Sequence, residues 1–355
     1  MSSILIVTDA WRPQINGVVR SLERLAEQLV EMGLRVEFLT PENFRSVPMP
    51  SYPEIRLSLT LPSEVRRHIE EADCDHLHIA TEGPLGLMAR SVAKRTGKVF
   101  TTSYHTRFPE YLNARVPVPV DWTYAWLRRF HNSGRGCMVA TQTLESDLKT
   151  RGFTNLVRWS RGVDHTVFRP LQSDVLEGVE GPIFMNVGRV AVEKNIEAFL
   201  KLDLPGSKVV VGGGPQLEEL RSAYPDVVFT GPKEGDDLVA LYSAADVFVF
   251  PSLTDTFGNV LLEALACGTP VAAYPVMGPV DVIGDSGVGV LDKDLRTACL
   301  AALEISSDAC REYALKYTWR ASAEQFLRNA ELAHETSQGF LQAAAKPQQQ
   351  VFTAH

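Results

Sequence analysis

The sequence predicts an α/β protein built from two successive domains, each with a parallel β-sheet covered by helices. Short β-branched and aromatic runs alternate with longer helix-like stretches along most of the 355 residues, a rhythm typical of parallel sheets. The length favours two domains, and a composition of 45% hydrophobic and 22% charged residues is that of an ordinary globular protein. Because one such series lies in each half, we expect two separate sheets.

The first series lies in residues 1–164, the predicted N-terminal domain. Its expected strands are 4–7, 36–39, 76–79, 99–102 and 137–140. A helix is expected between the first two strands, where apolar residues recur at helical spacing and stop before a glycine: Val18, Leu22, Leu25, Leu29 and Gly33.

The second series lies in residues 165–318, the predicted C-terminal domain, after a loop at 169–181 that has no periodicity. Its expected strands are 183–187, 208–211, 227–229, 246–250 and 270–273. A late helix is expected at 319–336, packed back toward the N-terminal domain. Residues 337–355 are expected to form a disordered tail.

Charge and cysteine content narrow the function. Residues 1–164 carry a net charge of +3 and the rest −11, so attraction of the first half to phosphate or anionic lipid and a chance distribution are equally good accounts. The five cysteines form no CxxC pair, which favours buried thiols. No apolar run is long enough to span a bilayer and Asp9 comes too early for a signal peptide, so we expect a cytoplasmic protein.

Each half has a glycine turn that could bind phosphate through backbone N–H groups. Gly17 opens the first helix, and Gly212-Gly213-Gly214 follows a strand of the second domain. Leu217 stands where a dinucleotide fingerprint needs its third glycine, and no Walker motif occurs, so nicotinamide and P-loop enzymes are disfavoured. Ligands of parallel sheets bind beyond the carboxyl ends of the strands, so the cleft between the domains is the expected site.

Charged residues gather in two stretches of the second domain. Asp255 lies in a loop after a strand, and Glu263 follows eight residues later in a helix, a spacing that lets both carboxylates accept hydroxyls of one extended polyol. Arg189 and Lys194 follow another strand, at an expected helix start where cations oppose the helix dipole. An anionic ligand is the better account of these cations.

Together these stretches resemble the retaining GT-B glycosyltransferases of family 4, over roughly residues 1–335. The motifs that carry the resemblance lie at 13–18, 103–106, 161–164, 188–195, 212–215 and 255–264. The resemblance implies two Rossmann-like domains facing across a cleft, with the nucleotide sugar bound by residues 165–318. This chain departs from the family's EX7E motif, because Asp255 replaces the first glutamate.

The resemblance also implies residue roles. Arg189 and Lys194 would hold the donor pyrophosphate, Glu263 the ribose, and Asp255 the sugar hydroxyls. His105 would approach the anomeric centre, which makes His105, Arg189, Lys194 and Asp255 the catalytic candidates. The implied donor-binding residues are Gly17, Arg189, Lys194, Gly213, Pro232, Asp255, Thr256, Phe257, Gly258, Asn259, Val260 and Glu263. No protein nucleophile, cofactor or metal is expected, and the DxD-like Asp73-Cys74-Asp75 is interpreted as a chance match.

Residues 107–131 interleave aromatic residues with arginines. The helix-spaced Trp122, Trp126 and Phe130 are equally consistent with a core helix and with a helix that meets a membrane surface. On the membrane interpretation, Trp122, Trp126, Arg128 and Arg129 would contact an anionic lipid surface and the acceptor.

The chain is similar to the family branch of bacterial diacylglycerol glycosyltransferases, sulfoquinovosyl-lipid synthases and lipid mannosyltransferases. This similarity implies transfer of glucose or glucuronic acid from a UDP-sugar to diacylglycerol, by an enzyme peripheral to the inner face of the cytoplasmic membrane. The alternatives are a GDP-mannose-dependent α-mannosyltransferase and a catalytically silent module that binds sugar nucleotides as a regulator. No nucleic-acid partner is expected.

Overall fold

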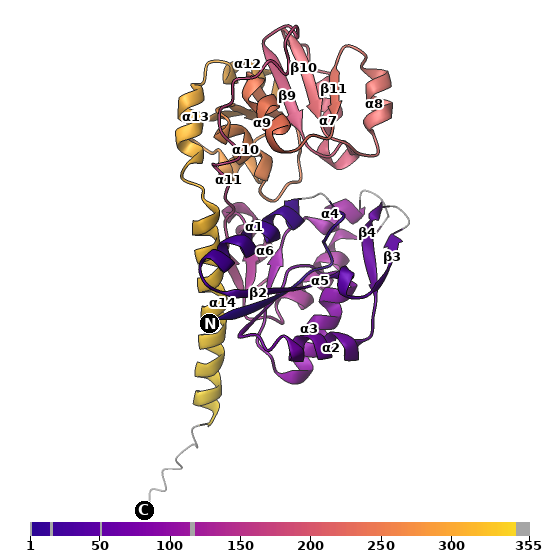
Figure 1. The fold of residues 1–355 in the computed structure, drawn as a ribbon, viewed down its shortest axis with the longest axis vertical. Coiled ribbons are helices and arrows are strands. Elements are labelled where there is room, and N and C mark those ends of the chain that lie inside the picture. The colour runs from indigo at the N-terminus through magenta and orange to yellow at the C-terminus, as the bar shows by residue number, and fades with distance from the viewer. Residues whose placement is uncertain (1, 15–16, 50–51, 114–117, 346–355) are drawn as a thin grey trace, which may run out of the picture.

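Two six-stranded parallel sheets organise the chain, one in each half, and the two domains stack along the long axis of the molecule (Figure 1). The computed structural model describes residues 2–14, 17–49, 52–113 and 118–345. The α/β architecture with two parallel-sheet domains confirms the predicted fold class.

The N-terminal sheet has the strand order β2-β1-β5-β6-β7-β8. Its strands are β1 Ser3–Val7, β2 Arg35–Leu39, β5 His76–Ile79, β6 Thr101–Tyr104, β7 Cys137–Val139 and β8 Leu156–Arg158. Its helices are α1 Gly17–Glu31, α2 Pro62–Glu71, α3 Pro84–Thr96, α4 Phe108–Asn113, α5 Val120–His131 and α6 Gln142–Thr150. The order reverses between β1 and β5, which is where open parallel sheets bind ligands.

The C-terminal sheet has the strand order β11-β10-β9-β12-β13-β14 and reverses between β9 and β12. Its strands are β9 Ile183–Val187, β10 Ser207–Val211, β11 Val228–Gly231, β12 Val247–Phe250, β13 Val271–Ala273 and β14 Gly289–Leu291. Its helices are α7 Ile196–Leu200, α8 Leu217–Ala223, α9 Gly235–Ala244, α10 Asn259–Ala266, α11 Pro279–Val282, α12 Leu295–Ala302 and α13 Ser307–Ala314. This is the doubly wound order of nucleotide-binding folds.

Alternate residues of the central strands pack on opposite faces of each sheet, as the pleat requires. In β1, Leu5 belongs to the core on one face of the sheet and Ile6 to the core on the other face. In β9, Met185 and Phe184 divide in the same way. The near-continuous apolar runs that predicted these strands therefore reflect burial on both faces.

Some elements were not predicted or were placed differently. The antiparallel hairpin of β3 Arg45–Met49 and β4 Tyr52–Leu59 was missed, because Pro48 and two arginines hide its strand pattern. The edge strands β8 and β14 were also missed, since each has only three half-buried residues. Strand β6 begins two residues later than expected, at Thr101.

The last helix, α14, spans Trp319–Ala345 and runs along the N-terminal domain (Figure 1). Phe326 on this helix is fully buried in the N-terminal core beside Trp159. Helix α14 continues to Ala345, and the expectation of a disordered tail from residue 337 stays a prediction. Of that stretch, residues 346–355 fall outside the described residues.

None of the helices in the described ranges is both long enough and apolar enough to span a membrane.

Candidate functional site

The expected site residues of the C-terminal domain meet where β9 and β12 end side by side. Lys194 follows β9 and Asp255 follows β12, and the Lys194 ammonium donates to both carboxylate oxygens of Asp255 at 2.6 and 2.8 Å. The amide of Asn195 donates to the carbonyl of Pro251 at 3.1 Å, which joins the same two loops. The switch point of the sheet thus carries a partly buried ion pair.

Arg189 and Lys194 precede a helix rather than beginning one. Residues Val192–Lys194 form a 3-10 turn, Asn195 takes a left-handed conformation, and α7 starts at Ile196. The expectation of two cations in the first helical turn was therefore wrong. The Asp255 carboxylate, rather than the helix dipole, determines the surroundings of Lys194, and half-buried Arg189 lies in the same loop.

The start of α10 faces the N-terminal domain. Gly258 precedes the helix with a left-handed φ of 84°, and Asn259 is its first residue. The Asn259 amide donates to the Ser21 hydroxyl of α1 at 3.1 Å. Gly17 lies beside this contact, since a Cβ on Gly17 would come within 3.7 Å of the Asn259 amide nitrogen. The structure therefore brings Gly17 and Asn259 together across the two domains.

Glu263 lies one turn further along α10 and is buried. The Tyr242 hydroxyl of α9 donates to its carboxylate at 3.0 Å. Burial raises the pKa of Glu263, while the charge of Arg20 on α1 and the Tyr242 hydrogen bond act in the opposite direction. Tyr242 and Arg20 were not predicted as site residues, because nothing in their local sequence marks them.

The loop after β10 packs closely against the loop that carries Arg189. A Cβ on Gly212 would lie 1.9 Å from the Gly188 carbonyl oxygen, so only glycine fits there. Gly213 lies against the Pro232 ring, which a Cβ on Gly213 would meet at 3.0 Å. These contacts give the glycine turn a packing role, and the expected donor-binding role of Gly213 and Pro232 stays a prediction.

Phe257 and Val260 also contribute apolar packing. Phe257 is buried, and half-buried Val260 packs against the same apolar core of the C-terminal domain. Any contact of Phe257 with a ligand would come from its backbone, as expected from the sequence.

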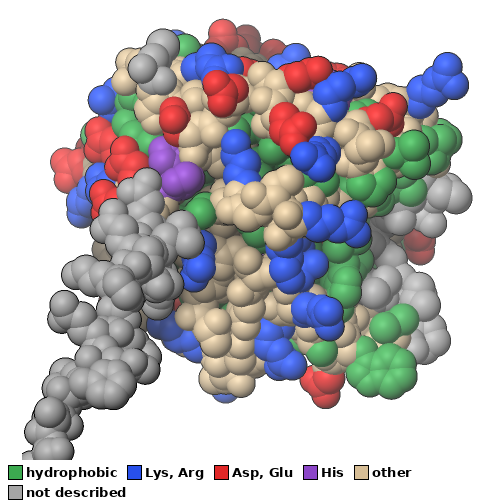
Figure 2. Space-filling model, turned by 90° about the horizontal axis from the view of Figure 1, so that it is seen from below, with side chains coloured by type: hydrophobic (Ala, Val, Ile, Leu, Met, Phe, Trp, Pro, Cys, Tyr) green, Lys and Arg blue, Asp and Glu red, His purple; other side chains and the backbone are tan. Residues whose placement is uncertain are grey.

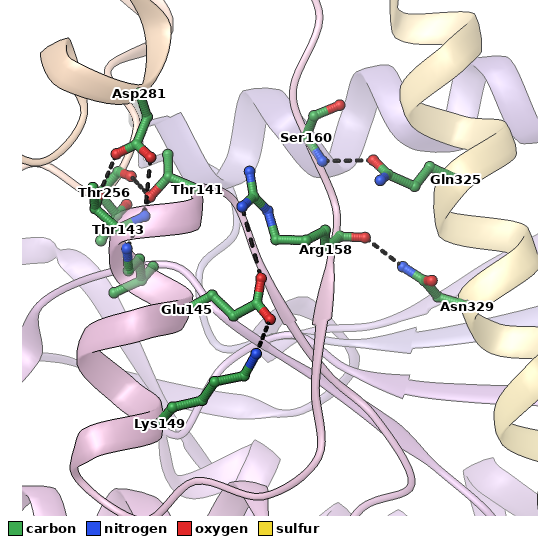
Figure 3. Close-up of polar contacts among 11 residues, drawn as sticks. Thr141, Thr143, Glu145, Lys149, Arg158, Ser160, Thr256, Asp281, Gln325 and Asn329 are labelled. Atoms are coloured by element: carbon green, nitrogen blue, oxygen red, sulfur yellow. Dashed lines mark hydrogen bonds and ion pairs between the residues drawn. The ribbon is translucent and has the colours of Figure 1, made fainter. Parts of the chain in front are cut away.

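The 255–258 loop contacts the N-terminal domain directly. The Thr256 hydroxyl donates to the His105 carbonyl at 2.7 Å, and the Thr141 hydroxyl donates to the Thr256 carbonyl at 3.2 Å. Nearby, the Asp281 carboxylate accepts from the backbone N–H of Thr143 at 3.0 Å and from the Thr143 hydroxyl, at the first turn of α6 (Figure 3). A carboxylate is favourable at a helix N-terminus, so Asp281 stabilises the approach of the two domains.

His105 follows β6 and faces this loop from the N-terminal domain. One Nη of Arg161 lies 3.2 Å from its Nδ1, and within the described residues its buried Nε2 has no hydrogen-bond partner. Burial lowers the pKa of His105 well below 6.5, and the charges of Arg161, His78 and His131 lower it further. His105 is therefore neutral at ordinary pH.

Known glycosyltransferases are similar to this chain in both of its domains. Residues 15–167 match the model of Glycosyltransferase Family 4, and residues 181–308 match a model described as Glycosyl transferases group 1. A GDP-mannose-dependent alpha-mannosyltransferase of Mycobacterium tuberculosis is 32% identical, with 81% of this chain and 83% of that protein aligned. The chain belongs to the family 4 glycosyltransferases.

One further related sequence and one solved structure are also similar to this glycosyltransferase. An alpha-monoglucosyldiacylglycerol synthase of Streptococcus pneumoniae is 25% identical, with 90% of this chain and 82% of that protein aligned. Sucrose-phosphate synthase from Thermosynechococcus elongatus has a TM-score of 0.76 at 20% identity, over 95% of this chain and 100% of that one. The glycosyltransferase therefore has the GT-B fold, as the sequence predicts.

In this glycosyltransferase, the candidate residues for membrane and acceptor contact lie on helix α5, apart from the donor-site candidates. Trp122 is 73% exposed and Trp126 is 40% exposed, whereas Phe130 is buried. The three do not form one core stripe, because Tyr124 and Leu127 fill the inner face instead. Arg128 and Arg129 are also exposed, and the Arg128 guanidinium donates to the Arg151 carbonyl at 2.9 Å.

Two acidic residues at the carboxyl end of the N-terminal sheet were missed. Buried Asp9 follows β1 and accepts from the N–H groups of Leu85 and Gly86 at 2.8 and 3.1 Å, so it secures the start of α3. Glu82 follows β5 and lies 2.9 Å from the Nε2 of His131. Their positions at the ends of neighbouring strands were the available signal.

The DxD-like stretch lies at the amino-terminal ends of the strands, opposite the carboxyl ends that carry Asp9 and Glu82. Asp75 precedes β5 and accepts from both the N–H and the hydroxyl of Ser3 at the start of β1. Its carboxylate therefore joins two strand starts, away from the cleft. Across the described part of the chain, no group of three or more His, Cys, Asp or Glu residues is arranged to hold a metal.

Proposed function

We propose that this glycosyltransferase transfers a glucosyl or glucuronosyl group from a UDP-sugar to diacylglycerol at an anionic membrane surface, with retention of anomeric configuration. The exposed α5 surface carries the lipid part of the proposal. Apolar surface in contact with water is entropically unfavourable. A tryptophan that is 73% exposed is therefore stabilised when a partner covers it. Trp and Arg on one helix are the residues that favour the lipid–water boundary.

The charge distribution on the surface of the N-terminal domain also supports contact with an anionic membrane. Lys and Arg side chains gather on the underside of the N-terminal domain, with hydrophobic side chains along one edge of the same face (Figure 2). Each basic residue close to an anionic membrane contributes about 1 kcal/mol of attraction. The S. pneumoniae relative, whose name specifies a glucosyl-diacylglycerol product, is consistent with this acceptor.

The ion pair at the switch point supports the donor part of the proposal. On donor binding, the Lys194 ammonium would turn from Asp255 to the diphosphate, together with Arg189, and stabilise the charge that develops on the leaving group. Asp255 would then be available to accept sugar hydroxyls. The pair thus holds both groups in place until the donor arrives.

Glu263 would accept the ribose hydroxyls. The carboxylate is already buried and oriented by Tyr242, so little ordering is needed when the ribose binds. Its raised pKa reflects the burial cost of the charged form, which two hydroxyl hydrogen bonds would offset.

Retention is compatible with front-face attack. The acceptor oxygen bonds to the anomeric carbon, the bond from that carbon to the diphosphate oxygen breaks, and the acceptor proton passes to the departing phosphate oxygen. This scheme needs no protein nucleophile and no protein base. The protein contributes positioning and electrostatic stabilisation.

A GDP-mannose donor is the second candidate, and the M. tuberculosis relative favours it. A catalytically silent sugar-nucleotide regulator would bind donor without turnover. One experiment separates these functions: UDP-glucose, UDP-glucuronate and GDP-mannose are each incubated with vesicles of anionic phospholipid and diacylglycerol, and labelled lipid is extracted.

We expect labelled glycolipid from a UDP-sugar, with its α-configuration shown by NMR, and none from an Asp255→Ala variant. Product only from GDP-mannose would transfer the proposal to the second candidate. Donor binding without product from any donor would overturn both.

A further inference from the structure

Arg161 is a buried arginine whose position the proposed reaction does not explain. Its side chain is stacked on the Trp159 ring, with the guanidinium carbon 3.9 Å from the ring centroid, and the residue is only 4% exposed. One Nη donates to the carbonyls of Trp159 and Ser160 at 2.8 and 3.2 Å, and the other lies 3.2 Å from the Nδ1 of His105. The guanidinium is therefore fixed by its own chain segment and directed at the histidine.

The chemistry of the pair determines where the His105 proton lies. A guanidinium has only donors, so the His105 nitrogen that it meets must accept. A neutral imidazole that accepts at Nδ1 carries its proton on Nε2. An imidazolium, or the other neutral tautomer, would direct an N–H at the guanidinium.

We infer that Arg161 is a positioning residue that holds His105 as the neutral Nε2–H tautomer, so that His105 donates a hydrogen bond to an oxygen of the bound donor sugar. This inference rests on the proposed function for the identity of the acceptor oxygen. The Nε2 atom is buried and unpaired within the described residues, which costs about 1–3 kcal/mol until an acceptor reaches it. With its Nδ1 lone pair engaged, His105 cannot serve as a general base.

The surrounding groups favour the same neutral state. In the N-terminal domain, His105 is near the charges of Arg161, His78 and His131, each of which lowers its pKa. At ordinary pH the charges that act are those of Arg161 and His131, because burial and Arg161 lower the pKa of His78 to about 3 and leave that residue neutral. On the facing loop, the charge of Asp255 is balanced by Lys194, so the ion pair leaves no net charge there to protonate His105.

The segment that carries Arg161 is braced by α14. The Trp159 indole N–H donates to the Ser322 hydroxyl at 3.1 Å, and the Gln325 side chain accepts from the Ser160 N–H at 2.8 Å (Figure 3). These contacts hold the Trp159 ring on which the guanidinium stacks. The last helix of the chain therefore helps to fix the orientation of a residue in the cleft.

The first test measures the tautomer directly. In protein labelled with 15N-histidine, two-bond correlations to the ring protons distinguish protonated from unprotonated ring nitrogens. We expect His105 to show a protonated Nε2 and an unprotonated Nδ1 between pH 6 and 8, and an Arg161→Met variant to show a mixture of tautomers. Protonated Nδ1 in the wild-type protein would overturn the inference, even if the variant failed to fold.

The second test measures activity. A His105→Gln side chain can place an N–H near the original Nε2, whereas His105→Asn places its amide near Nδ1, so we expect the glutamine variant to retain about tenfold more kcat/KM. Arg161→Lys should retain part of the activity that Arg161→Met loses. Equal activity of the two His105 variants would overturn the donor role. The NMR test needs no substrate, so failure of the proposed function and failure of this inference are distinguishable.

Discussion

Replacement of Trp122 by alanine tests whether α5 meets a membrane. The side chain is 73% exposed, so its removal should cost the folded protein little while it takes apolar area from the proposed lipid-binding surface. We expect the Trp122→Ala variant to keep its fold and its turnover of a short-chain, detergent-dispersed diacylglycerol. Its binding to anionic vesicles should weaken strongly.

The size of this effect follows from the exposed area of the ring. An aromatic side chain buries about 150–250 Å². With 73% of Trp122 available to lipid, full transfer at about 25 cal/mol per Å² would contribute about 3–4.5 kcal/mol. A ring that enters the interface to half its depth contributes about 2 kcal/mol, or roughly 30-fold in the partition coefficient.

The assay is co-sedimentation with phosphatidylcholine vesicles that contain or lack an anionic phospholipid, over a range of lipid concentrations. Leu315→Ala is the matched control, because Leu315 is an exposed apolar residue of the C-terminal domain. We expect the control to bind like the wild type. A Trp122→Ala partition coefficient within twofold of the wild-type value would refute the membrane role of α5. Equal wild-type binding to neutral and anionic vesicles would refute the preference for an anionic surface.

Three further predictions concern the site and its support. Asp255→Asn should lower kcat/KM for the donor by about 10–100-fold, because an amide replaces a charged hydrogen-bond acceptor; steady-state kinetics measures this. Burial raises the pKa of Glu263 above its ordinary value of 4.5, so protonation of Glu263 stabilises the folded state. This stabilisation is complete below pH 4.5 and is lost as the pH rises through the pKa of Glu263 in the folded protein. Glu263→Gln stays neutral and should therefore raise Tm at pH 7 but not at pH 4, while it weakens donor binding. Ser322→Ala should lower the free energy of unfolding in urea by about 1–3 kcal/mol, because the buried Trp159 indole N–H loses its acceptor.

Each of these predictions has a matched control at an exposed position: Asp285→Asn, Glu219→Gln and Ser146→Ala. The donor role of Asp255 fails if its variant matches the Asp285 control. A Tm at pH 7 that falls in Glu263→Gln would show that the charged carboxylate stabilises the unliganded fold. An unfolding free energy for Ser322→Ala equal to that of the Ser146 control would mean that another group satisfies the indole.

The central strands and the motif loops were predictable because each is marked by local sequence. A fully buried strand such as β12 is a continuous apolar run, and Asp255 lies in the loop that follows it. Lys194 lies in the loop after the largely apolar β9. The residues that support them were not predictable. Ser21 and Tyr242 occupy ordinary helix positions, and they act only because the fold brings them to Asn259 and Glu263.

The partners of the charged groups were also not predictable from the sequence. Arg189 and Lys194 were expected at a helix start, where an anionic ligand would be their main partner. The left-handed Asn195 delays the helix and places Lys194 against Asp255 instead, a contact between residues 61 positions apart. Such long-range pairing depends on strand order, which the sequence indicates only as a class of topology.

The inter-domain contacts give the two domains a physical basis for moving apart. The chain crosses between the domains twice, and the two crossings meet where Val163 pairs with Thr318 in an isolated parallel bridge. On the other side, Asn259, Thr256 and Asp281 reach the N-terminal domain through a small set of hydrogen bonds. Because such hydrogen bonds contribute only about 1 kcal/mol each, this side can separate while the paired crossings stay in place. A hinge at the crossings would move the Lys194–Asp255 pair relative to His105, so we expect donor binding and domain closure to be coupled.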